Sequence, residues 1–153
     1  MPDEVILGPV YNAVKAVMVA NAPLTALLSV KAIGGLPAVY DEGEVAVQNA
    51  TKPYIVVGGG TQNPDHTFGA PGSLRYGYNC TLQIKAVSQG SESGILAIMS
   101  KVAAALHEGL DIGIASYYAW CDERVLQPTI ITAQAGVVTR ESPLILRVKA
   151  YDS

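Results

Sequence analysis

The sequence has few charged residues and no cluster of positive ones. Asp, Glu, Lys and Arg make up 15% of its 153 residues, whereas about a quarter is usual in soluble domains. The net charge is −3, and no run of Lys or Arg occurs. Sustained nucleic-acid binding needs clustered cations that displace counterions, so the composition argues against it. So few charges also indicate that other protein chains cover part of the surface.

Cysteine is nearly absent, and no targeting segment is evident. Cys80 and Cys121 form no CxxC pair and lie in apolar, strand-like stretches. We expect buried, reduced thiols rather than a disulfide, in keeping with assembly in a cytoplasm. The start, MPDEVILGPV, lacks the basic part of a secretion signal. The apolar stretch 16–30 is interrupted by Pro23 and is shorter than the ~20 residues of a membrane span. We therefore expect a soluble, non-secreted protein.

Two segments have the periodicity of amphipathic helices. Apolar residues recur on one face from 9 to about 19, and a short helical turn begins at Pro23. The second helix follows the candidate N-caps Ser91 and Ser93. Its apolar stripe continues until Gly109, which we expect to end the helix.

Other segments have the pattern of strands. Residues 75–87 alternate strictly, as in an antiparallel strand with one solvated face. Residues 52–57 form a β-branched strand, and 117–151 contains two or three strands, the last from Leu144. This order predicts an α+β fold: a mainly antiparallel sheet of about four to six strands, two amphipathic helices on one face and a long loop. No repeat or boundary divides the chain, so we expect a single domain, 1–153.

Three consecutive glycines, Gly58, Gly59 and Gly60, follow the predicted strand at residues 52–57. A phosphate-binding loop would need GxxxxGK[ST], and a dinucleotide site would need GxGxxG opening a helix. The sequence has neither, and Pro64 stands where that helix would grow. We predict that the glycines end the strand and release a long loop or extended hairpin tip, residues 58–74, because Gly tolerates positive φ and close backbone approach.

No convergent set of catalytic or metal-binding residues is evident. His66 follows Asp65 in the predicted loop, and a metal or acid–base role is the alternative to a simple solvated side chain. His107 suits the C-terminal end of a helix dipole. The acidic group at 41–44 is typical of a polar turn, and 122–124 of a salt-bridged strand edge. We predict no enzyme activity, no cofactor and no metal.

The order of these segments resembles that of the small tail terminator proteins of long-tailed bacteriophages, also called tail completion or head–tail joining minor proteins. The resemblance covers roughly residues 9 to 150. It rests on the first helix and the segments that follow it: PLTALLSV, AVYDEG, KPYIVVGG, the long alternating strand, GSESGILAIMSKVAAAL and LILRVKAYD.

This resemblance implies a structural virion protein without catalysis. Such proteins form a closed, commonly sixfold ring that caps the tail tube, ends its polymerisation and joins it to the head. The implied partners are further copies of the chain, the tail tube protein, a head-completion, neck or connector protein, and genomic DNA only transiently in the bore. No membrane is involved. The implied location is the tail–neck junction of the virion, after assembly in the host cytoplasm.

Ring contacts need two different complementary patches on each subunit, which loops and sheet edges can supply. The single phenylalanine, Phe68, lies within the predicted loop and suits an apolar anchor for a partner. The predicted interface residues are Gly58, Gly59, Gly60, Thr61, Gln62, Asn63, Asp65, His66, Phe68, Arg75, Asp122 and Arg124.

Two alternatives stay open. The first is another ring-forming neck or stopper protein of a virion, which would share this architecture and differ in its neighbours. The second is a small enzyme or ligand-binding α+β domain, which would require a convergent polar cluster in a pocket.

Overall fold

The computed structural model describes residues 5–32, 34–44, 50–64, 67–68, 74–75, 77–115 and 117–152, and the side chains of these except 67, 68, 74, 75 and 152. The helices are α1 (Leu7–Ala20), α2 (Ala22–Thr25) and α3 (Glu92–Ala105). The strands are β1 (Val39–Asp41), β2 (Tyr54–Pro64), β3 (Thr67–Phe68), β4 (Leu74–Arg75), β5 (Gly77–Ser88), β6 (Gly109–Leu110), β7 (Tyr117–Leu126), β8 (Ile130–Gln134) and β9 (Val137–Asp152).

The fold is α+β, as predicted. Within the described residues, a 7-stranded sheet has the order β1-β2-β5-β9-β7-β6, with β8 added to β9. Only β1 and β2 pair in parallel. The count exceeds the expected four to six because β6 has only two residues, too few for an alternating pattern to reveal. The short strand predicted within LPAVYDEGE is confirmed as β1.

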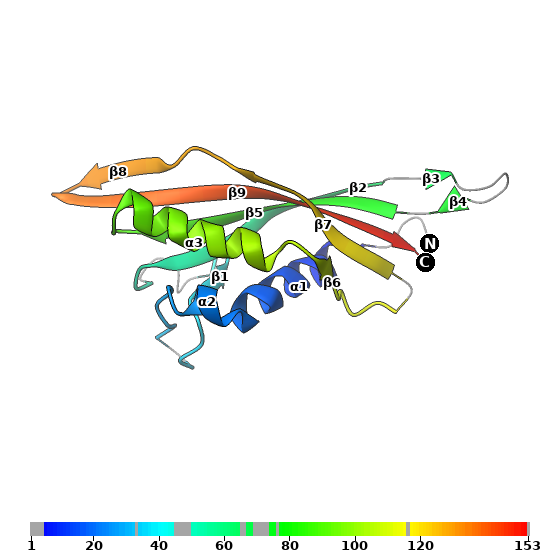
Figure 1. Cartoon of the computed structure of the whole chain (residues 1–153), viewed down its shortest axis with the longest axis horizontal. Coiled ribbons are helices and arrows are strands. Elements are labelled where there is room, and N and C mark those ends of the chain that lie inside the picture. Colours follow the sequence, from blue (N-terminus) through cyan, green and yellow to red (C-terminus); the bar gives the residue numbers. More distant parts are fainter. Residues whose placement is uncertain are drawn as a thin grey trace.

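Both long helices cover the same face of the sheet (Figure 1). Val10, Val14 and Met18 of α1 are buried, and so are Ile95, Ile98, Met99 and Val102 of α3. They pack into one apolar cluster with strand residues such as Leu82 and Leu146. We call this the inner face of the sheet and the opposite side the outer face.

The predicted helices are confirmed, with shifted ends. α1 begins at Leu7, so Pro9 stands in its first turn, where the missing N–H costs no hydrogen bond. The N-cap of α3 is Ser91, whose Oγ accepts a hydrogen bond from the nitrogen of Gly94 at 3.1 Å. Gly109 does not end α3: the C-cap is Leu106, and Gly109 starts β6.

The prediction that the three glycines end a strand is wrong, because β2 continues through them. The register of β2 against β5 shifts between Gly58 and Thr61, and Gly59 has φ +66°, so the strand bulges rather than stops. A Cβ at Gly58 would lie 2.1 Å from Glu42 Oε2, and one at Gly60 3.0 Å from Leu7 Cδ2. Close approach of neighbouring side chains therefore requires glycine here.

The predicted loop 58–74 is largely an extended hairpin. Its first seven residues belong to β2, and β3 pairs with β4 in antiparallel register further out. Figure 1 shows this short pair beyond the end of the main sheet. The remainder of the predicted loop lies outside the described residues.

The C-terminal part forms one long hairpin. β7 and β8 both pair antiparallel with β9 and follow one another along its length. The nitrogen of Gln127 still donates to the carbonyl of Pro143 at 2.8 Å between them. Ala135 and Gly136 connect β8 to β9 with φ of 52° and 79°, the two positive values of a type I′ hairpin turn.

Candidate assembly surfaces

The tip of the long hairpin projects beyond the rest of the sheet. β5 pairs with β9 only from Arg140 onward, so among the described strands residues 137–139 pair with β8 alone. We call residues 130–139 the arm. Figure 1 shows it extending past the start of α3, at the opposite end of the molecule from β3 and β4.

The arm is apolar and exposed. Every residue of β8 is exposed, with Ile130 at 51% and Ile131 at 59%. Val137 and Val138 on the facing strand are 46% and 37% exposed. No Asp, Glu, Lys or Arg occurs from Val125 to Thr139, a run of 15 residues. Natural edge strands are usually protected by charges, so this surface is suited to being covered.

Both faces of the arm carry apolar side chains. Ala133 stands opposite Val138, and Val138 shares the inner face with the buried Leu144 and Leu146. Val137 and Ile130 lie on the outer side, because neighbours along a strand point to opposite faces. A partner could therefore surround the arm rather than contact one side.

The base of the arm is fixed to the start of α3. Thr129 Oγ1 donates a hydrogen bond to Glu92 Oε1 at 2.9 Å, and Arg140 Nη1 donates to the carbonyl of Gly90 at 2.6 Å. Arg140 Nε also lies 3.4 Å from Glu92 Oε2. These contacts, from the residue before β8 and from β9, hold the base of the arm against the start of α3.

An apolar groove lies between α3 and the sheet. Its volume is about 240 Å³, and it is lined by Leu96, Met99, Ser100, Ala103, Arg124, Leu126 and Leu144. The one charged side chain in this lining is Arg124, whose Nη1 donates a hydrogen bond to the carbonyl of Ala103 at 2.7 Å. We call this the α3–β7 groove. Beside it, β6 pairs only with Ala119 and Trp120 of β7, so among the described strands β7 has an open edge from Cys121 onward.

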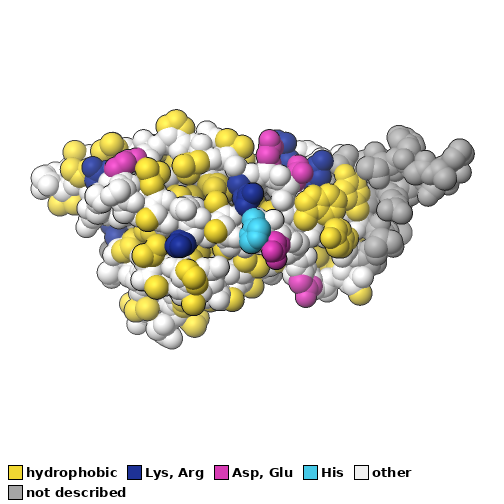
Figure 2. Space-filling view, viewed as in Figure 1, with side chains coloured by type: hydrophobic (Ala, Val, Ile, Leu, Met, Phe, Trp, Pro, Cys, Tyr) yellow, Lys and Arg dark blue, Asp and Glu magenta, His cyan; other side chains and the backbone are white. Residues whose placement is uncertain are grey.

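An exposed aromatic cluster occupies the other end of β7. The rings of Tyr118 and Trp120 lie 5.5 Å apart, and those of Trp120 and Tyr151 also 5.5 Å. Tyr118 is 66% exposed. Figure 2 shows hydrophobic side chains gathered both over the arm and over this end of β7, with charged side chains between them.

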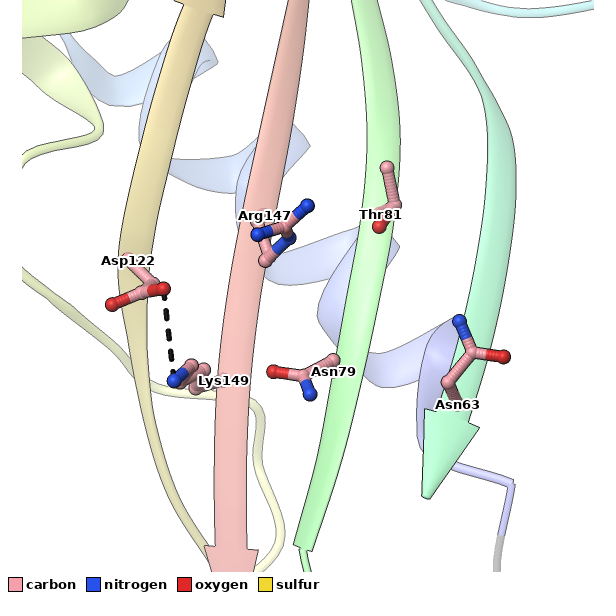
Figure 3. A pocket seen from close by; sticks show the side chains of 6 residues that line it. All are labelled: Asn63, Asn79, Thr81, Asp122, Arg147 and Lys149. Carbon is pink, nitrogen blue, oxygen red and sulfur yellow. Dashed lines mark ion pairs between the residues drawn. The ribbon is translucent and has the colours of Figure 1, made fainter. Parts of the chain in front are cut away.

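The outer face of the sheet carries a polar depression of about 280 Å³ (Figure 3). Asn63, Asn79 and Lys149 stand in one row across three strands. Lys149 Nζ lies 3.8 Å from Asp122 Oδ2, and Arg147 Nη1 lies 2.7 Å from Glu123 Oε2. Each of these ion pairs joins one positive and one negative side chain, so the charges around the depression cancel.

The residues predicted to form an interface do not lie together on one surface of the structure. Asn63 and Asp122 line opposite sides of the polar depression (Figure 3). Thr61 is exposed on β2, opposite Thr81. Arg124 instead faces α3. The predicted ion pairing of the 122–124 segment is confirmed for Asp122 and Glu123.

Gln62 has a structural role that the sequence did not reveal. Its Oε1 accepts hydrogen bonds from the nitrogens of Ile6 and Leu7 at 2.9 and 3.0 Å. It thereby caps α1, whose own N-cap side chain makes no such bond. The side chains of Phe68 and Arg75, and all of Asp65 and His66, lie outside the described part of the chain. The residues that sequence reasoning missed are those of the arm, for which the uncharged run before Arg140 is the available signal.

The titratable groups with shifted pKa values remain protonated at neutral pH. Burial raises the pKa of the Cys80 and Cys121 thiols to about 11. Burial, with Asp41 nearby, raises the pKa of Tyr11 to about 12. His107 lies just after α3, with Nδ1 against the carbonyl of Ala104, as predicted from the helix dipole.

The two cysteines are free, as predicted. Cys80 and Cys121 both stand opposite Val148, on either side of β9. Two strand spacings separate them by roughly 10 Å, beyond the range of a disulfide. Among the described residues, no group of three or more His, Cys, Asp and Glu side chains could hold a metal ion. No helix in the described part of the chain is long and apolar enough to span a membrane.

Comparison with known proteins gives a similarity of fold. No protein-family model matches the chain, and no curated protein is similar to it in sequence. A chain in the solved structure of the virion of a native gene transfer agent particle is similar over 97% of this chain and 99% of that one. The TM-score is 0.60 and the sequence identity is 18%. The two chains therefore share the fold over nearly their whole lengths.

Proposed function

We propose that this chain is a structural virion protein that assembles with copies of itself into a ring at the end of a phage-like tail. The observation that carries the proposal is the similarity of fold, which spans 97% of this chain and 99% of a chain from a gene transfer agent virion. Such complete coverage favours a shared role of the whole domain over reuse of a common substructure.

The specific role that we propose is that of tail terminator. The ring, sixfold by the family resemblance, would cap the tail tube and present its other side to a head-completion, neck or connector protein. Its activity would lie in assembly, without catalysis or cofactor. DNA would pass through the bore only in transit, and a chain of net charge −3 without cationic clusters suits passage without retention.

The exposed surfaces are suited to ring contacts. A ring is built from heterologous contacts, in which two different patches of the same chain meet. The arm and the β3–β4 hairpin lie at opposite ends of the molecule (Figure 1), and the aromatic cluster adds a third exposed patch. We propose that the β3–β4 hairpin, with Phe68 and Arg75, contacts a neighbouring ring, together with the outer-face residues Thr61, Asn63 and Asp122.

The oligomeric state tests this proposal. The purified chain is expected to give a ring mass, about six times that of the monomer, in light scattering, with rings in negative-stain images. If the chain is monomeric alone, it is mixed with isolated tail tubes, because the tube can act as the template. A chain that forms no ring alone and does not bind tube ends would refute the proposal.

A second candidate, a neck or stopper ring protein, differs in its neighbour. The mixing experiment separates the two, since a terminator binds the end of the tail tube and stops its growth. A stopper would bind the head connector instead. Growth of tubes from purified tail tube protein, with and without the chain, therefore decides which ring it forms.

A further inference from the structure

The arm and the α3–β7 groove are complementary surfaces that one copy cannot bring together. The arm continues along the direction of β9, because β9 is one uninterrupted strand from Val137 past Leu144, which lines the groove (Figure 1). From the level of Leu144 to Val137 the strand advances seven residues, about 24 Å, away from the groove. Both surfaces are therefore left open in a single copy.

The arm would bring no charge of its own into a contact, and the groove would bring one, Arg124. The 15 residues from Val125 to Thr139 are uncharged. In the groove, Arg124 is already bonded to the carbonyl of Ala103. Burying an unpaired charge would cost several kcal/mol, so an uncharged arm adds no such cost of its own. Arg124 is held at the C-terminal end of α3, where the helix dipole favours a cation.

Two further features favour contact between the arm and the groove: an open strand edge beside the groove and the fixed base of the arm. The edge of β7 beside the groove has no strand partner beyond Trp120 in the described part of the chain, so an incoming strand could extend the sheet there. The base of the arm is held by Thr129 on Glu92 and by Arg140 on Gly90. A prearranged arm loses less conformational entropy on binding than a disordered segment would.

We propose that the arm of one copy packs into the α3–β7 groove of the next copy around the ring. This inference rests on the proposed ring. A second copy is the occupant because each chain carries one such arm and one such groove, the two complementary patches that a heterologous ring contact requires. Standard interfaces use about 20–30 residues a side, so the arm and its base supply a large part of one contact.

Directed cross-linking tests the contact. In a chain with Cys121→Ala, and with Cys80 left in place because it is fully buried, Val138→Cys is placed on the arm and Ser100→Cys in the groove. Mixing the two variants and oxidising the assembled ring should give a covalent dimer that neither variant gives alone. Lys101→Cys, an exposed neighbour of Ser100 outside the groove lining, should give at least fivefold less.

A double variant with both cysteines in one chain should give a ladder of covalent oligomers up to the closed ring. A ring that assembles normally but gives no Val138–Ser100 cross-link overturns the arm–groove contact and leaves the proposed function intact. Failure to assemble either alone or on tail tubes overturns both.

A charge in the arm provides an independent readout. Ile131→Lys should leave the Tm of the unassembled chain unchanged and raise the concentration needed for half assembly at least tenfold. Leu36→Lys is the matched control, because Leu36 is 58% exposed and Ile131 59%, and it should assemble normally. Normal assembly of Ile131→Lys would contradict the inference.

Discussion

The side chain of Gln62 is bonded to the backbone of Ile6, with Oε1 2.9 Å from the nitrogen, across 56 residues of sequence. A strand residue thus supplies the cap that the first helix lacks, and it ties the start of α1 to β2 beside the glycine bulge. The same side chain was predicted from sequence to face a partner.

Replacing Gln62 by Ala should destabilise the fold. The backbone N–H groups of Ile6 and Leu7 would lose their acceptor, and loss of a helix cap costs about 0.5–2 kcal/mol. Gln62→Glu should retain most of the stability, because a carboxylate near a helix N-terminus interacts favourably with the dipole. Urea denaturation measures both, with Asn63→Ala, at an exposed neighbour, as the control. Equal stability of Gln62→Ala and the parent would show that this cap contributes nothing.

Gly58→Ala should destabilise the fold by about 1–3 kcal/mol, the usual cost of overpacking. The added Cβ would lie 2.1 Å from Glu42 Oε2 and 2.6 Å from the Cβ of the same residue. Gly8→Ala is the matched control, because nothing lies within 4 Å of a Cβ there and alanine favours a helix. Thermal unfolding of both variants gives the comparison, and a neutral Gly58→Ala would mean that Glu42 moves aside freely.

Ala135→Asn should stabilise the hairpin that forms the arm. Ala135 has φ 52°, a conformation in which alanine is disfavoured and asparagine is better tolerated. With Gly136 following, the variant creates the Asn-Gly pair preferred in type I′ turns, and we expect a gain of about 0.5–1 kcal/mol in free energy of unfolding. Ala133→Asn, in the adjacent strand, should bring no gain. A loss of stability in Ala135→Asn would exclude the type I′ assignment.

Alkaline pH should weaken the fold partly through its thiols. Burial raises the pKa values of Cys80 and Cys121 from an ordinary value of 9.0 to about 11 in the folded chain. A raised folded pKa gives stability that is complete below pH 9 and is lost as the pH rises toward 11. Urea denaturation at pH 8, 9, 10 and 11 measures the decline. Replacing both cysteines by Ala should reduce its slope, whereas an unchanged slope would assign the decline to other groups such as Tyr11.

The elements that the sequence predicted correctly are those with many repeats of one pattern. β5 alternates from Tyr78 to Ala86 between buried and more exposed side chains, and α3 buries Ile95, Met99 and Val102 at helical spacing. The pattern of apolar residues within each of these segments is enough to predict whether it forms a helix or a strand.

What the sequence could not show depends on residues far apart in the chain. Three glycines indicate a break in a strand unless one knows that Glu42 and Leu7 pack against them. Likewise, Gln62 is read as a surface residue unless α1 is known to begin beside it. The arm was missed for a related reason. Its residues have the pattern of strands, but only the pairing shows that β5 stops at Arg140 of β9 and leaves residues 137–139 without it.

One strand, β9, runs for 16 residues from the arm to the last described residue of the chain, a length of roughly 50 Å. It is paired with β5 along one edge and with β7 and β8 along the other. A pull along this strand would load its hydrogen bonds in shear, so that many must break together rather than one after another. If the protein joins two parts of a particle, such a strand would resist a force that pulls those parts away from each other.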